Sequence, residues 1–460
     1  MKFDNIHSVY FLGIGGIGMS ALALWFKSAG KNVSGYDKTP TRITENLEQK
    51  GISVHFDENI DKIPDTVKKD TENSLVIITP AIPSDHSEKL WFEEKGIKLR
   101  KRAEILGLIS SAFPCIAVAG THGKTSVSSM IAHLLKNSGR NVTAFVGGLM
   151  KNYQSNVILG NAQAETHWVV AEADEFDRSF LHLHPDLAII TSVEADHLDI
   201  YGKEDSLKES FREFASRIRG NGKLYVQSKF VNDFKDLKGI SISDYNLENA
   251  TIHAEDLFVS PDQFSFTYVD DKGKIENLEL YIPGFHNVEN ALAAISVCKN
   301  FSLSDEEIRK GIASYKGVSR RFDLIVKSEQ IIYIDDYAHH PTEISALLKS
   351  VRRIYPGKKI TAIFQPHLYT RTRDFAKGFS ESLSLADRVI LLPIYPAREK
   401  PIEGVDSAML LEEIHTDEKD VLTKDEALKE VEKLNDGILL TVGAGDIDQL
   451  VPKIKTVLNG

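Results

Sequence analysis

Cysteine is scarce in this sequence. Only Cys115 and Cys298 occur among the 460 residues, and each lies in an apolar segment. Two isolated cysteines provide no zinc-binding spacing, so a structural zinc site built on thiolates is excluded. We expect both to be small core residues of a protein that folds in a reducing compartment.

Long apolar runs and an excess of positive charge are also missing. No apolar stretch is long enough to cross a bilayer, and Met1–Asn5 does not resemble the start of a signal peptide. The formal net charge of −11 argues against a broad nucleic-acid-binding surface. We therefore expect a cytoplasmic protein with no nucleic-acid or membrane partner, and the sequence leaves open whether it is a monomer or a homodimer.

The most informative stretch that is present is the glycine loop Gly120–Ser126. It follows the apolar run Cys115–Ala119 and precedes an amphipathic helical pattern that ends near Gly139. A strand, a glycine loop and a helix in this order present backbone N–H groups and a positive helix end to a phosphate. Lys124 would reach the outer phosphates of a nucleotide, and Thr125 would offer its hydroxyl to Mg²⁺.

This loop departs from the usual phosphate-binding spacing. Val118 occupies the position of the first glycine, and Gly120 opens a loop that is one residue shorter. A glycine turn before a helix, with no ligand, is the alternative interpretation. The apolar strand before the loop and the amphipathic helix after it favour nucleotide binding.

A second glycine loop, Gly13–Gly18, follows the apolar run Ser8–Leu12 and fits the G-x-G-x-x-G pattern. Asp37 ends the next predicted strand about 20 residues later, where an acid binds a ribose in dinucleotide sites. Alone, this pattern would predict an NAD-dependent dehydrogenase. It establishes only that a diphosphate can bind at a helix N-terminus, and a nucleotide sugar carries the same diphosphate. Tight strand–helix packing without a ligand is the alternative.

Acidic residues follow the strand that is predicted to end at Ala171. Glu172 is the first acid after this strand, and we predict that it binds a nucleotide-bound Mg²⁺. His197 follows the next predicted strand and is either a metal ligand or an ordinary loop histidine. The later acids are compatible with loop charges that face solvent: Asp174, Glu175 and Asp177.

The segment Asp244–Ile282 alternates in short apolar and polar steps, which predicts an antiparallel insertion that covers one side of a domain. A helix follows, and its Asn287 and Asn290 lie one turn apart on one face. These two amides would contact an adenine edge or cap the helix.

Paired arginines lie near a predicted domain junction. The forked guanidinium groups of Arg320 and Arg321 suit a carboxylate or a phosphate. A solvated pair with no ligand is the alternative.

Four predicted strands in the last third of the chain each deliver polar residues at the carboxyl end. Asp336, Tyr337 and His339 follow the first of these strands, before a helix with Pro341 in its first turn. Arg371 follows the second. This arrangement favours an open parallel sheet whose crevice is lined by these side chains.

Together these elements predict an α/β protein with three domains, within the range of about two to four that this length allows. The first, residues 1–112, is a Rossmann-like domain. The second, residues 113–322, is a P-loop-type, ATPase-like parallel sheet with the antiparallel insertion. The third, residues 323–460, is a Rossmann-like open sheet. The first boundary lies in a predicted linker, Ser110–Pro114.

This ordered set of motifs resembles the Mur ligases of peptidoglycan synthesis, over all three predicted domains. The run Asp336–Pro341 and the run Glu194–His197 are most similar to the branch of the family that adds L-alanine. The branch that recycles muramyl peptides usually has phenylalanine where Tyr337 lies. The matching elements are Gly13–Ala23, Gly120–Ser126, Glu172–Asp177, Glu194–Asp199, His286–Ala294, Arg320–Asp323, Asp335–Ile344, Phe364–Thr372 and Tyr395–Gly404.

The resemblance implies a ligase that uses ATP and Mg²⁺ to join L-alanine to the lactoyl carboxylate of UDP-N-acetylmuramate, through an acyl phosphate. One alternative is a ligase that adds a muramyl peptide. Another is a nicotinamide-dependent dehydrogenase built on Gly13–Gly18, which would leave Gly120–Ser126 and Glu172 without a role. A non-catalytic nucleotide-binding protein is the third.

The resemblance also implies a role for each matching residue. Lys124, His339 and Arg371 would be catalytic. The implied metal ligands are Thr125, Glu172 and His197. The residues implied to bind ATP are Gly120, Thr121, His122, Gly123, Lys124, Thr125, Ser126, Asn287, Asn290, Arg321 and Asp336. The residues implied to bind the other substrates are Gly13, Gly15, Gly16 and Gly18 at the UDP diphosphate, and Tyr337, His339 and Arg371 at the amino-acid and acyl-phosphate end.

The chain departs from the family pattern at a few positions. Leu368 stands where many family members have arginine, so the resemblance does not provide a second arginine near the amino-acid carboxylate. Ser126 and Val127 stand where threonines are common, but Thr125 is present. Relatives carry a carbamylated lysine at the metal site; the alanine-adding branch lacks it, and we expect none here.

Overall fold

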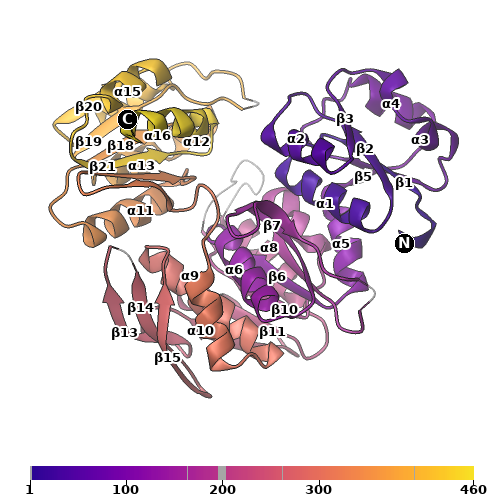
Figure 1. The fold of residues 1–460 in the computed structure, drawn as a ribbon, viewed down its shortest axis with the longest axis horizontal. Helices are drawn as coiled ribbons and strands as arrows, with labels where there is room; N and C mark the ends of the chain where they lie inside the picture. Colours follow the sequence, from indigo (N-terminus) through magenta and orange to yellow (C-terminus); the bar gives the residue numbers. More distant parts are fainter. Residues whose placement is uncertain (1–2, 163, 195–203, 262, 398, 460) are drawn as a thin grey trace. The chain divides into compact units, whose positions relative to one another are not determined.

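The computed structural model describes residues 3–162, 164–194, 204–261, 263–397 and 399–459 (Figure 1). The chain divides into two compact units. Unit 1 comprises residues 1–255, 268–275 and 289–314, and unit 2 comprises residues 256–267, 276–288 and 315–460. Among the described residues, no helix has the length and apolar character needed to span a membrane.

The first sheet in unit 1 is parallel and has the strand order β3-β2-β1-β4-β5. Its strands are β1 (Ser8–Leu12), β2 (Asn32–Tyr36), β3 (Ser53–His55), β4 (Ser74–Ile78) and β5 (Leu99–Lys101). The helices are α1 (Ile17–Ser28), α2 (Arg42–Gln49), α3 (Asp65–Lys69), α4 (Ser87–Glu94) and α5 (Arg102–Ala112). The order reverses at β1, so the loop after β1 lies at the point where such sheets bind ligands.

The second sheet of unit 1 has the order β12-β11-β10-β6-β9-β7-β8. Only the β7–β8 pair is antiparallel among the pairings of its described residues. The strands are β6 (Cys115–Ala119), β7 (Val142–Met150), β8 (Ser155–Ile158), β9 (Trp168–Ala173), β10 (Leu187–Ile190), β11 (Lys223–Gln227) and β12 (Ser241–Tyr245). Its main helices are α6 (Lys124–Asn137), α8 (Glu204–Ser216) and α10 (Asp305–Ser314).

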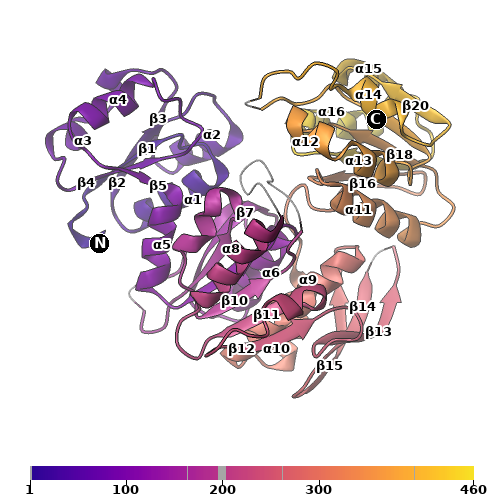
Figure 2. The ribbon, with the colours of Figure 1, turned by 180° about the vertical axis from the view of Figure 1, so that it is seen from behind.

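Helices cover both faces of this central sheet. The α6 crossover leads from β6 toward β7, and the α8 crossover leads from β10 to β11 in the opposite direction along the sheet. Right-handed crossovers in opposite directions place their helices on opposite faces. Accordingly, α6 lies in front of the sheet in Figure 1, and α8 lies in front of it when the molecule is seen from behind in Figure 2.

A small sheet of three strands follows in the chain, with the order β13-β14-β15. Its strands are β13 (His253–Val259), β14 (Phe264–Asp270) and β15 (Gly273–Leu280), and α9 (Phe285–Cys298) comes next. The predicted insertion is therefore present, but it begins later than predicted. Asp244 lies in β12, which pairs in parallel with β11 in the central sheet.

The sheet of unit 2 has the order β16-β17-β21-β18-β19-β20, and among the pairings of its described residues only that of β16 with β17 is antiparallel. Its strands are β16 (Asp323–Lys327), β17 (Ile331–Asp336), β18 (Ile360–Phe364), β19 (Arg388–Leu391), β20 (Glu418–Val421) and β21 (Gly437–Val442). Its helices are α11 (Pro341–Ile354), α12 (Tyr369–Asp374), α13 (Ala376–Leu383), α14 (Ser407–Glu412), α15 (Lys424–Val431) and α16 (Leu450–Asn459). The predicted open parallel sheet is confirmed.

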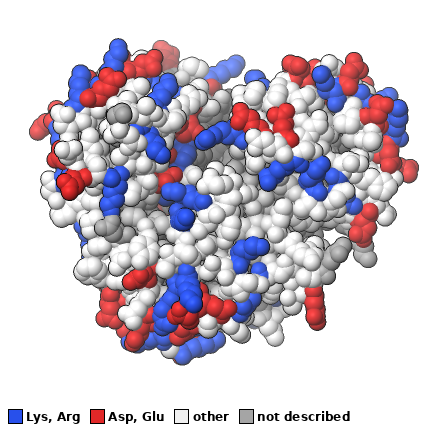
Figure 3. Space-filling view, in the orientation of Figure 1, with Lys and Arg blue, Asp and Glu red and all other residues white. Residues whose placement is uncertain are grey.

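Several local predictions can be compared with these elements. Cys115 and Cys298 are both buried free thiols, as expected for core residues. The predicted linker at Ser110–Pro114 is wrong in extent, because α5 continues through Ala112 and only Phe113 and Pro114 separate it from β6. Basic and acidic side chains are interspersed on the side seen in Figure 3. The predicted bounds of the three domains stay predictions.

A buried carboxylate on α4 packs against the first sheet. Glu88 is fully buried and accepts hydrogen bonds from the hydroxyl of Tyr10 (2.5 Å) and the backbone N–H of Asn59 (3.2 Å). His55 lies 3.7 Å from the same carboxylate. Burial raises the pKa of Glu88 to about 7, although these hydrogen bonds oppose the shift.

This raised pKa predicts a pH-dependent loss of stability. The folded chain holds the Glu88 proton up to about pH 7, whereas the unfolded chain releases it near 4.5. Stability therefore falls as pH rises between these values, by about 1–3 kcal/mol. Glu88→Gln removes this titration. We therefore expect the difference between the melting temperature of Glu88→Gln and that of the wild type to increase in favour of the variant as the pH rises from 5 to 8.

Calorimetric scans of the two proteins across this pH range measure the effect. Glu58→Gln is the matched control, because Glu58 lies nearby but is exposed. Parallel pH profiles for Glu88→Gln and the wild type would contradict the assignment.

Candidate active site

The glycine loop between β6 and α6 has the geometry of a phosphate-binding loop. Gly120 has a φ of +139° and Gly123 a φ of +81°, and other residues rarely adopt such angles. A Cβ on Gly120 would also lie 2.0 Å from the hydroxyl of Thr191. The two glycines are therefore required by the backbone, and α6 begins immediately after them with no acidic residue in its first turn. Its positive end is left for an anion.

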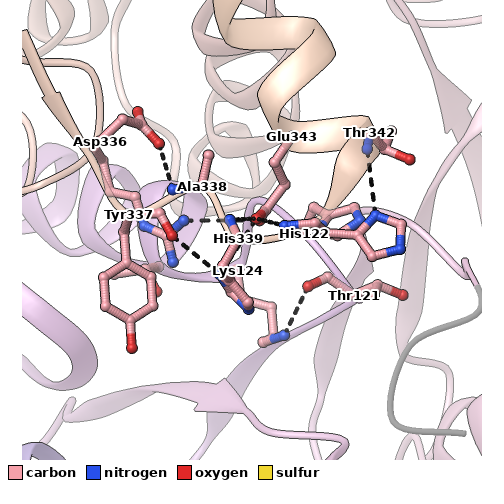
Figure 4. A network of polar contacts seen from close by, with 12 residues as sticks. Thr121, His122, Lys124, Asp336, Tyr337, Ala338, His339, Thr342 and Glu343 are labelled. Carbon is pink, nitrogen blue, oxygen red and sulfur yellow. Dashed lines mark hydrogen bonds and ion pairs between the residues drawn. The ribbon is translucent and has the colours of Figure 1, made fainter. Parts of the chain in front are cut away.

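Lys124 is held at the mouth of this loop by acceptors of the protein itself. Its ammonium donates to the carbonyl oxygens of Gly120 (2.5 Å) and Thr121 (3.2 Å; Figure 4) and lies 2.8 Å from a carboxylate oxygen of Glu175. Burial lowers the pKa of Lys124, but the neighbouring carboxylates, Glu175 foremost, outweigh burial and the pKa ends above its ordinary value. Lys124 is therefore held as a cation in a largely enclosed position, with its side chain 14% exposed.

The interpretation of Glu175 as a loop charge that could face solvent is wrong. Its side chain is only 2% exposed, and burial raises its pKa above the ordinary value while Lys124 opposes this shift. Asp174 and Asp177 are 39% and 47% exposed and pair with cations of their own. Nothing in the motif distinguishes the one acid among these three that is buried.

Thr125 and Glu172 meet at the start of α6, as the metal prediction requires. The Thr125 hydroxyl donates to the Glu172 carboxylate over 2.9 Å, and the N–H of Gly147 donates to the other oxygen over 2.6 Å. A hydroxyl and a carboxylate are the hard oxygen ligands that Mg²⁺ prefers, so this pair fits the ion. His197, the third predicted ligand, lies outside the described residues.

The remaining loop residues are held by the segment that follows the neighbouring strand β10. The N–H of His122 donates to the Ser192 hydroxyl over 2.8 Å. The His122 ring lies 3.5 Å from the Glu194 carboxylate. His122, together with Lys229, lowers the pKa of Glu194 to about 2, although burial opposes the shift. Thr121 also exchanges hydrogen bonds with the backbone of Glu194. Ser192 and Glu194 thus position the loop, which the sequence motif alone did not predict.

The two predicted adenine-binding amides lie in different surroundings. The side-chain amide oxygen of Asn290 lies 3.1 Å from the position that a Cβ on Gly123 would occupy, so this side chain reaches the phosphate loop. The Asn287 amide donates to the Pro283 carbonyl over 2.7 Å at the start of α9. Contact of either residue with adenine stays a prediction.

The first glycine loop is anchored by Asp37. The Asp37 carboxylate accepts the N–H of Gly15 over 2.7 Å. Gly13 has a φ of +88°, which only glycine adopts easily. The helix α1 begins at Ile17, with no acidic residue in its first turn. The loop is thus held open at a helix N-terminus, where a diphosphate can bind.

In unit 2, the loop after β17 is built around Asp336. Its carboxylate accepts the N–H groups of Phe322 (2.6 Å) and Ala338 (2.8 Å; Figure 4). Burial raises the pKa of Asp336 to about 6, against the opposing charge of Arg321. Asp336 therefore holds the loop that carries the next two predicted residues, Tyr337 and His339.

Cations and a histidine lie around this loop. The guanidinium groups of Arg320 and Arg321 each lie 5.0 Å from the centre of the Tyr337 ring. Arg320 also pairs with Asp335 over 3.3 Å, so it is not a merely solvated residue. The backbone N–H of His339 donates to the Glu343 carboxylate over 2.9 Å. The ring Nδ1 of His339 lies 3.0 Å from the Tyr337 carbonyl oxygen (Figure 4).

Arg371 lies on α12 and is 8% exposed. The residue before this helix, Leu368, has a φ of +68°. Its N–H donates to the Tyr395 carbonyl, and its own carbonyl accepts the Thr372 hydroxyl. The backbone at Leu368 is thus held in a conformation that leucine rarely adopts, next to the predicted amino-acid end of the site.

Comparison with known proteins covers nearly the whole chain. The model "Mur ligase family, catalytic domain" matches residues 8–114, "Mur ligase middle domain" residues 118–298, and "Mur ligase, glutamate ligase domain" residues 320–445. A UDP-N-acetylmuramate–L-alanine ligase from Flavobacterium johnsoniae is 48% identical over 100% of this chain and 99% of its own. One from Phocaeicola vulgatus is 44% identical over the full length of both.

Solved structures agree with this similarity. A UDP-N-acetylmuramate–alanine ligase from Thermotoga maritima has a TM-score of 0.80 at 27% identity and covers 98% of this chain and 99% of its own. A murein peptide ligase from Psychrobacter arcticus has a TM-score of 0.71 at 23% identity, with 99% of both chains covered. The second likeness shows the fold alone.

The contact between Gly147 and Glu172 gives a test of the metal site. A Cβ on Gly147 would lie 2.5 Å from the Glu172 carboxylate, so Gly147→Ala must push that carboxylate away from Thr125. The fold should survive, because only the end of a flexible side chain has to move. We expect the Mg²⁺ concentration for half-maximal nucleotide binding to rise about tenfold.

Mg²⁺ titration of the binding of an ATP analogue measures this change. Leu149→Ala is the matched control, because Leu149 lies two residues further along β7 and is 37% exposed. An unchanged Mg²⁺ requirement in Gly147→Ala would remove Glu172 from the metal site.

Proposed function

The chain belongs to the Mur ligase family, and we propose that it joins L-alanine to the lactoyl carboxylate of UDP-N-acetylmuramate in an ATP-dependent reaction. The observation that carries this proposal is the buried Lys124 ammonium at a strand–glycine loop–helix junction, beside the Thr125–Glu172 pair. Relatives that are 44–48% identical over at least 98% of this chain are UDP-N-acetylmuramate–L-alanine ligases.

The alanine-adding activity is favoured over the addition of a muramyl peptide. The relatives named UDP-N-acetylmuramate–L-alanine ligase match the chain at 44–48% identity, whereas the murein peptide ligase from Psychrobacter arcticus matches it at 23%. Tyr337 also lies where peptide-adding relatives usually have phenylalanine. A dehydrogenase would leave Lys124, Thr125 and Glu172 unused.

The reaction needs an activated carboxylate, because a carboxylate does not condense with an amine in water. A lactoyl carboxylate oxygen attacks the γ-phosphorus of ATP and forms an O–P bond. The bond between the γ-phosphorus and the β–γ bridging oxygen breaks, and its electron pair stays on that oxygen, which leaves as part of ADP. The alanine amine then attacks the acyl carbon. The tetrahedral intermediate collapses to the amide, inorganic phosphate leaves with the C–O electron pair, and the amine gives up a proton.

Lys124 would bind the outer phosphates of ATP. Its ammonium exchanges the Glu175 carboxylate and the loop carbonyls for phosphate oxygens, while the N–H groups at the start of α6 bind the same anion. Two anions approach each other in the first step, so the site must neutralise charge and position the reactants. Bound Mg²⁺, held by Thr125 and Glu172, would supply further positive charge at the transferred phosphoryl group.

The other substrates are assigned to the remaining predicted domains. Residues 1–112 would bind the UDP diphosphate at Gly13–Gly18, so no nicotinamide is expected. Residues 113–322 would bind ATP. Residues 323–460 would bind L-alanine and the acyl phosphate through Tyr337, His339 and Arg371, with Arg321 and Asp336 supporting the nucleotide.

Release of phosphate with UDP-N-acetylmuramate, ATP and a panel of amino acids tests the function directly. We expect turnover with L-alanine and little with a tripeptide acceptor that begins with L-alanine. Preference for the tripeptide would replace the proposal with a peptide-adding ligase. Absence of phosphate release with every acceptor would reject both ligases.

The same assay tests the role of Lys124. Lys124→Ala should lower turnover by about 10²–10³-fold, the typical loss when one charge-stabilising group is removed. The fold should survive, because Glu175 can take up a proton when its partner is absent. Lys136→Ala is the matched control, since Lys136 is exposed in the last turn of the same helix. Near-wild-type turnover of Lys124→Ala would show that the loop has been misinterpreted.

A further inference from the structure

Three acids of one short turn pair with cations from two different elements, the start of α5 and the phosphate loop. The turn follows β9 and leads into a 3-10 helix at Phe176–His182. Asp174 pairs with Arg102 over 3.3 Å, Glu175 with Lys124 over 2.8 Å, and Asp177 with Lys101 over 3.0 Å. Lys101 and Arg102 lie at the start of α5, so the turn connects the last helix of the first sheet with the phosphate loop of the second.

Arg102 also lies against the first glycine loop. Its Nη1 is 2.5 Å, and its Cδ 2.9 Å, from the position that a Cβ on Gly18 would occupy. Any side chain at residue 18 would displace the guanidinium. Gly18 therefore has no side chain because Arg102 packs against this first turn of α1. The same end of the helix presents the loop N–H groups.

The two ends of the guanidinium serve different neighbours. Nη1 faces Gly18, whereas Nη2 donates to the Asp174 carboxylate. The Arg102 and Asp174 side chains are 30% and 39% exposed, so a ligand can reach the pair from solvent. A planar guanidinium can bind an anion on one edge while the other edge stays on its carboxylate.

Asp174 is fixed well enough to hold Arg102 in place. Its other carboxylate oxygen accepts the N–H of Phe176 over 3.1 Å, and its carbonyl accepts the N–H of Phe180 over 2.8 Å. The helix α5 approaches the same segment closely, because a Cβ on Gly107 would lie 2.6 Å from the His182 carbonyl oxygen. Backbone hydrogen bonds and close packing therefore hold the Asp174 carboxylate in place next to Arg102.

We propose that Arg102 binds the substrate diphosphate at Gly13–Gly18 and that Asp174 is the positioning residue that holds its guanidinium over Gly18. This inference rests on the proposed function, since it takes the ligand to be a uridine diphosphate. Arg102 supplies the positive charge that the glycine loop itself lacks. Asp174 keeps the long side chain in one rotamer, which lowers the entropy lost on binding.

Calorimetric titration without ATP separates this role from catalysis. The probes are UDP-N-acetylmuramate, UDP and uridine. Arg102→Met should weaken binding of the two diphosphates about tenfold or more, whereas its effect on uridine should stay within about twofold, because only the charge contact is lost. Arg102→Lys should recover part of the loss. A purely structural role would weaken all three probes alike.

Asp174→Asn tests the positioning role. It should weaken diphosphate binding about threefold to tenfold and add nothing in an Arg102→Met background, because the two residues act as one unit. Lys101→Met is the matched control. Its pair with Asp177 is the neighbouring one and is more exposed, at 56% and 47%, so binding should stay within about twofold.

The outcomes distinguish this inference from the function that it rests on. If the wild type binds UDP-N-acetylmuramate and Arg102→Met binds it equally well, the Arg102 role is wrong and the ligase proposal stands. Additive losses from Arg102→Met and Asp174→Asn would overturn the positioning role alone. If the wild type binds none of the uridine nucleotides, both the inference and the proposed substrate fail. Should Arg102→Met not fold, Arg102→Lys and Asp174→Asn carry the same test.

Discussion

The buried ion pair between Lys124 and Glu175 is the contact on which the candidate site depends. A buried ammonium is stable only with a partner, and loss of that partner typically costs about 3–5 kcal/mol. Glu175 is that partner here, at 2.8 Å and almost without solvent exposure. The loop carbonyls of Gly120 and Thr121 complete the set of acceptors. The chain thus keeps a cation in place for an anionic ligand.

The same arrangement recurs at two other residues that are proposed to bind substrates. Arg102 is paired with Asp174, and Arg321 with Glu343 at 3.8 Å. In each case a carboxylate of the protein lies on a cation whose proposed task is to bind a phosphate or carboxylate of a substrate. Such pairing prevents the cations from repelling one another or distorting the loops before the substrates arrive. It also means that substrate binding is an exchange of anions, not the capture of a free cation.

The loops and sheets could be predicted because their signals are local. Glycines at Gly120 and Gly123 follow a buried strand and precede a helix, and the backbone there indeed has positive φ angles. Glu172 could be identified because it is the first acid of its segment, although β9 runs through it to Ala173 and does not end at Ala171 as predicted. Two features depend on which strands pair: the antiparallel edge strand of the last sheet and the start of the insertion. Neither strand of a pair determines by its own sequence which strand it will pair with.

The partners of the site residues could not be predicted, for a physical reason. Glu175 turns inward in a turn whose next residues include Asp177 and Arg178, with φ angles of +52° and +54°, and no glycine in the sequence indicates this conformation. Gly120 and Thr191, which follow the adjacent strands β6 and β10, are in contact although they are 71 residues apart in sequence. Arg102 reaches Gly18 and Asp174 only after α5 has folded against the turn. Such contacts arise from tertiary packing, which motif spacing does not encode.

The most direct test of the account is a crystal structure with a non-hydrolysable ATP analogue and Mg²⁺. The account predicts that the triphosphate lies against the start of α6, that the Lys124 ammonium has left Glu175 for its outer phosphate oxygens, and that the metal lies between Thr125 and Glu172. A triphosphate bound elsewhere, with Lys124 still on Glu175, would contradict it.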